Sequence, residues 1–205
     1  MRLEKPRKLP RQERSRLLVA RILDATARIL STRGYAGLST NAVAEAAEIS
    51  IGSLYQYFPN RDALVAAVVE RHGERVYRMI MDEAGAPPRS LAEGVQQMVA
   101  GVIAAHRLDP HLHAVLESEM PKLRIFDGHA ATVKAIGDRL GALPPTIAAG
   151  LRVRDVAQAA SVVGEMVHAL VHSVLIHPSE SSLSPADLER ETVQAVIAYL
   201  TAPFG

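Results

Sequence analysis

Six side chains have the residue types of a metal site, and they fall into two groups. These are His106, His111 and His113, and Glu165, His168 and His172. The second group is spaced at i, i+3 and i+7, which places it on one face of a helix, where imidazole and carboxylate ligands could hold a divalent cation. No nucleophile or water-activating partner accompanies either group, and histidines on a packed helix face more often form hydrogen bonds. We therefore predict no metal and no catalytic site.

The stretch ISIGSLYQYFPNRDAL, residues 49–64, places three of the chain's eight aromatic residues within four positions. On a helical wheel that starts at Ile51, its side chains separate onto two arcs. The apolar arc holds Ile51, Leu54 and Phe58, and the polar arc holds Gly52, Ser53, Gln56 and Tyr57. Tyr55 lies on the apolar side, near its margin. The polar arc has hydrogen-bonding groups without charge, and a second surface could approach closely at Gly52. We predict that DNA is this surface.

Composition and charge limit the class of protein. The absence of cysteine excludes a disulfide framework and a thiolate metal site. The basic N-terminus, MRLEKPRKLPRQERSR, lacks the apolar core of a signal peptide, and no run of about 18 uncharged apolar residues occurs. We therefore expect a cytoplasmic protein without a membrane segment. Residues 1–71 hold 12 Lys or Arg against 7 Asp or Glu, which favours a nucleic-acid-binding head, although a solvated basic tail gives the same count.

A period of 3.6 residues recurs throughout the chain and predicts an all-α protein of about nine helices. We expect these helices at about 14–33, 40–47, 51–58, 61–84, 90–106, 110–117, 126–140, 154–176 and 185–201. The second and third are short and are joined by Glu48-Ile49-Ser50, which is the geometry of a helix-turn-helix. On this pattern alone, a helical hairpin in an all-helical enzyme remains an equal alternative.

The segment TNAVAEAAEISIGSLYQYFPNRDALVAAVVERH, with RILDATARILSTRGYAGLST before it, removes most of this ambiguity. Over about residues 14–72 the chain resembles the N-terminal domain of the tetracycline-repressor (TetR) family of bacterial transcription regulators. The resemblance implies that Leu54 and Phe58 are core and that eight other residues contact DNA. Those eight are Thr40 and Arg61 on phosphates, Ser50, Gly52, Ser53 and Gln56 at the groove, and Tyr55 and Tyr57 on phosphates or base edges. Tyr55 would also pack part of its ring.

Glu48 departs from the family pattern, which usually has glycine at this position. A glycine would end the second helix in the left-handed conformation, and the same conformation costs Glu about 1 kcal/mol. We expect the turn to survive. The N-terminal arm either reaches the DNA or is a solvated tail.

The resemblance also implies a regulatory domain whose last two helices pair with those of a second subunit in a four-helix bundle. The breadth of the apolar surface on these helices supports such a dimer, although an internal core is the alternative. The predicted interface is Val156, Val163, Val167, Leu170, Val171, Val174, Val193, Val196, Ile197 and Leu200. A two-fold dimer would present two recognition helices to a palindromic operator.

A ligand pocket is expected between the helices of this domain. The segment LAEGVQQMVAGVIAAHRLDPHLHAVLESEMPKL is loosely similar to C-terminal domains of part of the family. The candidate lining is Met98, Val102, His106, Leu112, Leu116, Met120, Phe126 and His168, for each of which ordinary core is the alternative. Only four aromatics follow residue 71, so an aliphatic or mixed apolar ligand is preferred over a flat aromatic one.

We therefore predict a basic arm at 1–13, a three-helix DNA-binding domain at 14–60 and a helical ligand-binding and dimerisation domain at 61–205. The expected protein is a homodimeric, ligand-responsive transcriptional repressor, released from double-stranded DNA by a small apolar or amphipathic molecule, without enzymatic activity or cofactor. Two alternatives remain: a metal-dependent enzyme that uses the face of Glu165, His168 and His172, and an architectural protein that binds DNA without sequence preference. The sequence leaves open whether the protein also activates.

Overall fold

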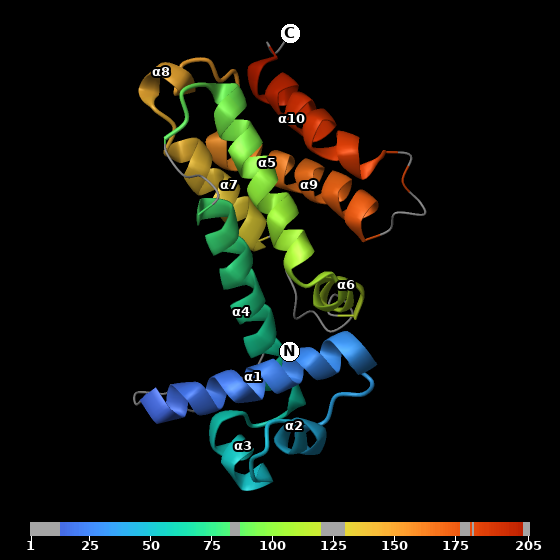
Figure 1. Ribbon diagram of the computed structural model, residues 1–205. Coiled ribbons are helices and arrows are strands. Elements are labelled where there is room, and N and C mark those ends of the chain that lie inside the picture. Colours follow the sequence, from blue (N-terminus) through green and yellow to red (C-terminus); the bar gives the residue numbers. More distant parts are fainter. Residues whose placement is uncertain (1–12, 83–86, 120–129, 177–180, 182, 203–205) are drawn as a thin grey trace. The chain divides into compact units, whose positions relative to one another are not determined.

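The computed structural model describes residues 13–82, 87–119, 130–176, 181 and 183–202. Within these ranges the regular elements are all helices, which confirms the all-α prediction (Figure 1). The helices are α1 Glu13–Arg33, α2 Thr40–Ala46, α3 Ile51–Tyr57, α4 Arg61–Asp82, α5 Leu91–Leu108, α6 Pro110–Glu119, α7 Ala130–Gly141, α8 Pro145–Ala148, α9 Val156–Leu175 and α10 Pro185–Thr201. No helix in the described ranges combines the length and the apolar character needed to cross a bilayer. The basic arm lies outside the described residues, except for Glu13.

Helix α8, a single turn that begins at Pro145, is absent from the predicted helices. The pair Pro144-Pro145 at its start indicates a break between helices when it is taken by itself. Proline is nevertheless favoured at the first helical position, where its missing N–H is not needed. The pair therefore marks the start of this helix.

The chain forms two compact units, which we describe separately. The first comprises residues 1–72 and 111–127, and the second comprises 73–110 and 128–205. The predicted division at 60/61 follows the end of the helix-turn-helix, whereas the compact units change at 72/73, within α4. The predicted domain boundary therefore differs from the boundary between the compact units, and the functional division at 60/61 stays a prediction.

Side-chain caps define the helix ends in the first unit. The hydroxyls of Ser39 and Ser50 each accept a hydrogen bond of 3.1 Å from a backbone N–H three residues ahead, at the starts of α2 and α3. The amide oxygen of Asn60 accepts one of 2.9 Å at the start of α4. These caps satisfy N–H groups that have no partner within the helix. Gly34 takes a φ of 63° after α1, a conformation that glycine adopts without steric cost.

The core of the first unit holds α2 and α3 against α1. Its fully buried side chains include Ile22 and Leu30 of α1, Val43 of α2, Leu54 of α3, Leu64 and Val68 of α4, and Leu116 of α6. Leu54 and Phe58 are buried, as predicted. Burial of about ten such side chains fixes the two short helices, which would be marginal in isolation.

The second unit is built from α5, α7, α9 and α10, which pack against one another. Helices α7 and α9 pack closely at Gly164. A β-carbon at this position would lie 2.6 Å from Cγ2 of Val133, so a larger residue would require the Val133 side chain or the helix to shift. The N-termini of α5, α9 and α10 are capped by Ser90, Asp155 and Ser184.

The predicted dimer interface requires a correction in this unit. Six of its ten side chains are at most 2% exposed, namely Val163, Val167, Val171, Val174, Val196 and Leu200. They belong to the unit's own core, where α5 and α7 cover α9. A side chain without exposed surface cannot contact a second subunit. Only Val156, Leu170, Val193 and Ile197 of the predicted set keep exposed surface.

Candidate nucleic-acid interface

The turn between α2 and α3 contains the one non-glycine residue with positive φ in the described chain, Glu48, at 54°. The Ile49 N–H donates to the Ala44 carbonyl at 3.0 Å, and the Glu48 N–H donates to Glu45 at 3.0 Å. This pair of bonds is a Schellman motif, which normally has glycine at the left-handed position. The predicted conformation is therefore present, with glutamate in it.

Two arginines of α1 donate hydrogen bonds to backbone carbonyls at this turn. Arg28 donates to the Ala46 carbonyl at 3.0 Å, and Arg21 donates to the Ala47 carbonyl at 2.5 Å. These bonds satisfy carbonyls at the end of α2 that have no helical partner. Arg21 also approaches the exposed Glu48 carboxylate at 3.8 Å. Neither arginine is among the predicted site residues, although their i, i+7 spacing on an amphipathic helix places them on one face.

Replacing Glu48 by glycine is expected to raise the free energy of unfolding by about 1 kcal/mol, because glycine adopts the left-handed conformation without the steric cost. The substitution also removes the exposed ion pair with Arg21, which contributes little to the free energy of unfolding. Urea denaturation measures the change. The matched control is Glu45→Gly, inside α2, which should instead destabilise by about 1 kcal/mol. Destabilisation by both variants would show that the turn is not strained.

Helix α3 presents an uncharged polar surface. Gly52 and Gln56 are exposed, and Tyr55 is 42% exposed. The Ser50 and Ser53 hydroxyls lie 2.8 Å apart, and the Tyr55 hydroxyl lies 3.2 Å from the Thr40 hydroxyl. The last contact joins the start of α2 to the middle of α3. Six of the eight predicted DNA-binding residues therefore lie in the α2–α3 hairpin with hydroxyl, amide or backbone groups at its surface.

The side chain of Tyr57 is buried, whereas the sequence predicts that it faces DNA. It is only 9% exposed and packs in the core of the first unit. The wheel was centred on Ile51, which is in fact 37% exposed. Leu54, Tyr57 and Phe58 define the buried face, and Tyr55 lies outside it. The roles expected of the two tyrosines are therefore exchanged: Tyr55 is the surface residue and Tyr57 is the packing residue.

Arg61 is held by neighbours of its own unit. Its guanidinium lies 4.0 Å from the centre of the Tyr35 ring and 3.4 Å from the Leu38 carbonyl. The Tyr35 hydroxyl donates to Asp62 at 2.8 Å. Burial, followed by this bond and the carboxylate charge, raises the pKa of Tyr35. These contacts fix the guanidinium at the start of α4, and its contact with phosphate remains a prediction.

The structure does not gather the predicted ligand pocket into one unit. Met98, Val102, His106 and His168 are buried in the second unit, whereas Leu112 and Leu116 belong to the core of the first. Met120 and Phe126 lie outside the described residues. An amphipathic helix such as α6 does not reveal from its sequence which core it joins.

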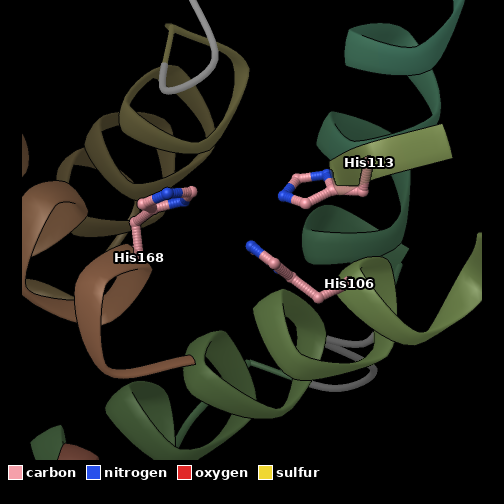
Figure 2. Close-up of side chains that lie close together, drawn as sticks. All are labelled: His106, His113 and His168. Carbon is pink, nitrogen blue, oxygen red and sulfur yellow. The ribbon is translucent and has the colours of Figure 1, made fainter. Parts of the chain in front are cut away.

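The buried histidines of the second unit contact each other through their rings. The His106 and His168 ring centres are 5.5 Å apart with a tilt of 53°, and Figure 2 shows these two rings projecting from α5 and α9. His168 stacks on His172 at 5.2 Å, and a His106 ring nitrogen lies 2.8 Å from the Val102 carbonyl. Glu165 is exposed, whereas His168 is buried. The proposed ligand face of α9 therefore divides between solvent and core. His111 is also exposed.

Comparison with known proteins assigns both parts of the chain. Residues 22–68 match the family described as bacterial regulatory proteins, tetR family, and residues 90–200 match the tetracyclin repressor-like C-terminal domain. Over 125 residues the chain is 32% identical to the HTH-type transcriptional repressor KstR of Rhodococcus jostii, a match that spans 60% of this chain and 54% of that relative. The chain thus spans about half the length of this curated relative.

Two solved structures show the same fold. A TetR-family transcriptional regulator from Mesorhizobium loti has a TM-score of 0.68 and 21% identity, over 92% of this chain and 97% of its own. The multidrug binding protein EbrR, complexed with imidazole, has a TM-score of 0.63 and 20% identity, over 91% and 96%. The C-terminal match alone covers more than half of the 205 residues. The chain therefore belongs to the tetR family of bacterial regulatory proteins, a family of DNA-binding regulators rather than enzymes.

Proposed function

We propose that the protein is a homodimeric, ligand-responsive transcriptional repressor that reads a palindromic operator with α3. The observation that carries this proposal is the exposed, uncharged surface of α3, with Gly52 open to close approach and a hydrogen-bonding side chain at Gln56. Such a surface suits the major groove, where base edges offer donors and acceptors. The DNA target places this activity in the cytoplasm.

The proposal assigns different tasks to different residues of the hairpin. Gln56 can form two hydrogen bonds with an adenine, and Ser53 can bond a base edge or a phosphate. Thr40 and Tyr55, whose hydroxyls lie 3.2 Å apart, form a pair suited to one phosphate oxygen. Tyr57 acts through packing, because it holds α3 in its orientation.

The dimer is proposed through the surface of α9 and α10 that the core leaves uncovered. Its apolar members include Val156, Val162, Leu170, Val193 and Ile197. Val162, at 40% exposed, was absent from the predicted interface. Pairing of this surface about a two-fold axis would present two copies of α3 to symmetric half-sites. The related repressor and the multidrug binding protein support the repressor and ligand assignments by their names.

Helix α4 is the proposed route between ligand and DNA. It begins four residues after α3 ends, and its residues belong to the first unit up to His72 and to the second from Gly73. In the first unit, Arg71 donates to Asp24 of α1 at 2.7 Å. A ligand that binds one conformation of the second unit better would shift α4 and change the separation of the two recognition helices.

Fluorescence anisotropy tests this function with purified protein on the DNA upstream of its own gene and on a scrambled duplex, across a salt series. We expect a preference of about 10³-fold or more for the upstream DNA. Equal, steeply salt-dependent binding to both duplexes would instead support the architectural alternative. Sedimentation of the free protein checks the dimer, and a monomer at micromolar concentration would contradict the proposed interface.

A further inference from the structure

The second unit contains a cavity that differs from the predicted ligand pocket. Met98 is the one predicted pocket residue in its described lining. Its volume is about 220 Å³, and it lies among α4, α5, α7 and the residues after α7. The apolar wall includes Met81, Leu91, Val95, Met98, Leu140 and Leu143. A single charged side chain, Arg139, completes the described lining.

Arg139 is half-buried and lacks an acidic partner in the described part of the chain. Its guanidinium donates to the Gln97 side-chain oxygen at 3.0 Å and to the Ile80 carbonyl at 3.4 Å. Burial lowers the pKa of this group. A guanidinium has five N–H donors, so the two bonds leave donors for a further acceptor. The site therefore combines a positive charge, removed in part from water, with free hydrogen-bonding capacity.

The chemistry of a suitable ligand follows from this combination. A neutral apolar molecule would cover the guanidinium without compensating its charge, which is unfavourable, and a cation would be repelled. A carboxylate can accept two parallel hydrogen bonds from one guanidinium, and this is among the strongest pairings in proteins. The ligand head should therefore be a carboxylate, and the apolar wall calls for a hydrocarbon tail.

The cavity is partly open, and its volume of about 220 Å³ leaves room for a hydrocarbon tail against the apolar wall. We propose that this cavity binds an aliphatic monocarboxylate of medium chain length, with its carboxylate on Arg139 and its chain against the wall of the cavity. The inference deepens the proposed function, on which its regulatory meaning rests, because it names the class of the effector.

Calorimetry of the full chain with sodium octanoate tests the binding site in the absence of DNA. Octanol and octylamine, which share the chain but not the charge, are the comparison ligands. Octanoate is expected to bind about 10- to 100-fold more tightly than octanol, as hydrogen bonds to a charged group require. Equal affinity for the three ligands, or no binding of octanoate, would overturn the proposal.

Two variants and one control separate ligand binding from folding. Arg139→Gln should remove the preference for octanoate over octanol, and Ala142→Phe, at an exposed position of the lining, should block both ligands while keeping the arginine. Lys134→Gln removes a charge from the same helix at a position outside the cavity and should leave binding unchanged. Thermal melting verifies that each variant folds. Unchanged octanoate binding in both cavity variants would refute the site.

The same titration on operator-bound protein distinguishes failure of the site from failure of the function. Release of DNA by octanoate in the wild-type protein, and its loss in Arg139→Gln, is the expected result. Calorimetric binding without release would retain the cavity assignment and refute its role as the effector site. A protein without operator preference would refute the proposed function, while calorimetry still decides the cavity.

Discussion

Replacing Gly52 by glutamate is expected to lower operator affinity by about 10³-fold or more, which removes the margin that separates specific from non-specific binding. The new side chain adds bulk and negative charge where α3 should enter the groove. The fold should be unaffected, because apart from the helix's own backbone and the adjacent residues, the described atom that a β-carbon at Gly52 would meet within 4 Å is the Ser50 hydroxyl, at 3.9 Å. Stability should even rise slightly, since glutamate favours a helix more than glycine does. Fluorescence anisotropy and thermal melting measure the two quantities.

Gly141→Glu is the matched control for this variant. Gly141 ends α7 in the second unit and is exposed, and a β-carbon added there would meet no described atom within 4 Å. The substitution changes the net charge of the protein by the same amount, so it corrects for general repulsion from DNA. We expect it to retain most of the operator affinity. Equal losses in the two variants would show that charge, and not the surface of α3, accounts for the effect.

Replacing Tyr57 by alanine is expected to lower the free energy of unfolding by about 3 kcal/mol, as for other large aromatic side chains truncated in a core. Tyr57 is 9% exposed and packs among the helices of the first unit. Tyr57→Phe keeps the ring and should cost much less. Urea denaturation, followed by circular dichroism, measures both variants.

Tyr55→Ala provides the opposite pattern at a neighbouring tyrosine. Tyr55 is 42% exposed, so its truncation should change stability by about 0.5 kcal/mol or less. It removes the hydroxyl that contacts Thr40 and should weaken operator binding. If Tyr57→Ala kept full stability and lost DNA binding, the assignment of the two tyrosines would have to be reversed.

The local elements of the first unit were predictable because their signals are local. Ser39, Ser50 and Asn60 each precede a helix by one residue, and each caps it in the structure. The left-handed turn at Glu48 was predictable from the family resemblance, because the family usually has glycine at this position. The orientation of α3 was not, because a seven-residue helix has too few side chains to define its buried face. The wheel therefore depended on the assumed position of Ile51.

Packing between helices that are distant in the chain was harder to predict from the sequence. The valines of α9 fit a dimer interface and an internal core equally well, and only the positions of α5 and α7 show which surface is covered. The sequence did not identify Arg139 as a site residue, because its role in a binding site depends on the apolar side chains that surround it in the fold. These include Met81 and Leu143, which lie on other segments of the chain.

The close contact at Gly164 limits the motions available to α9. Rotation of α9 about its axis would bring a larger neighbouring side chain towards Val133, where even a single added carbon would lie 2.6 Å from Cγ2. A conformational change of the second unit should therefore involve little rotation of α9 about its own axis. Glycine at position 164 thus sets a limit on how far α9 can turn.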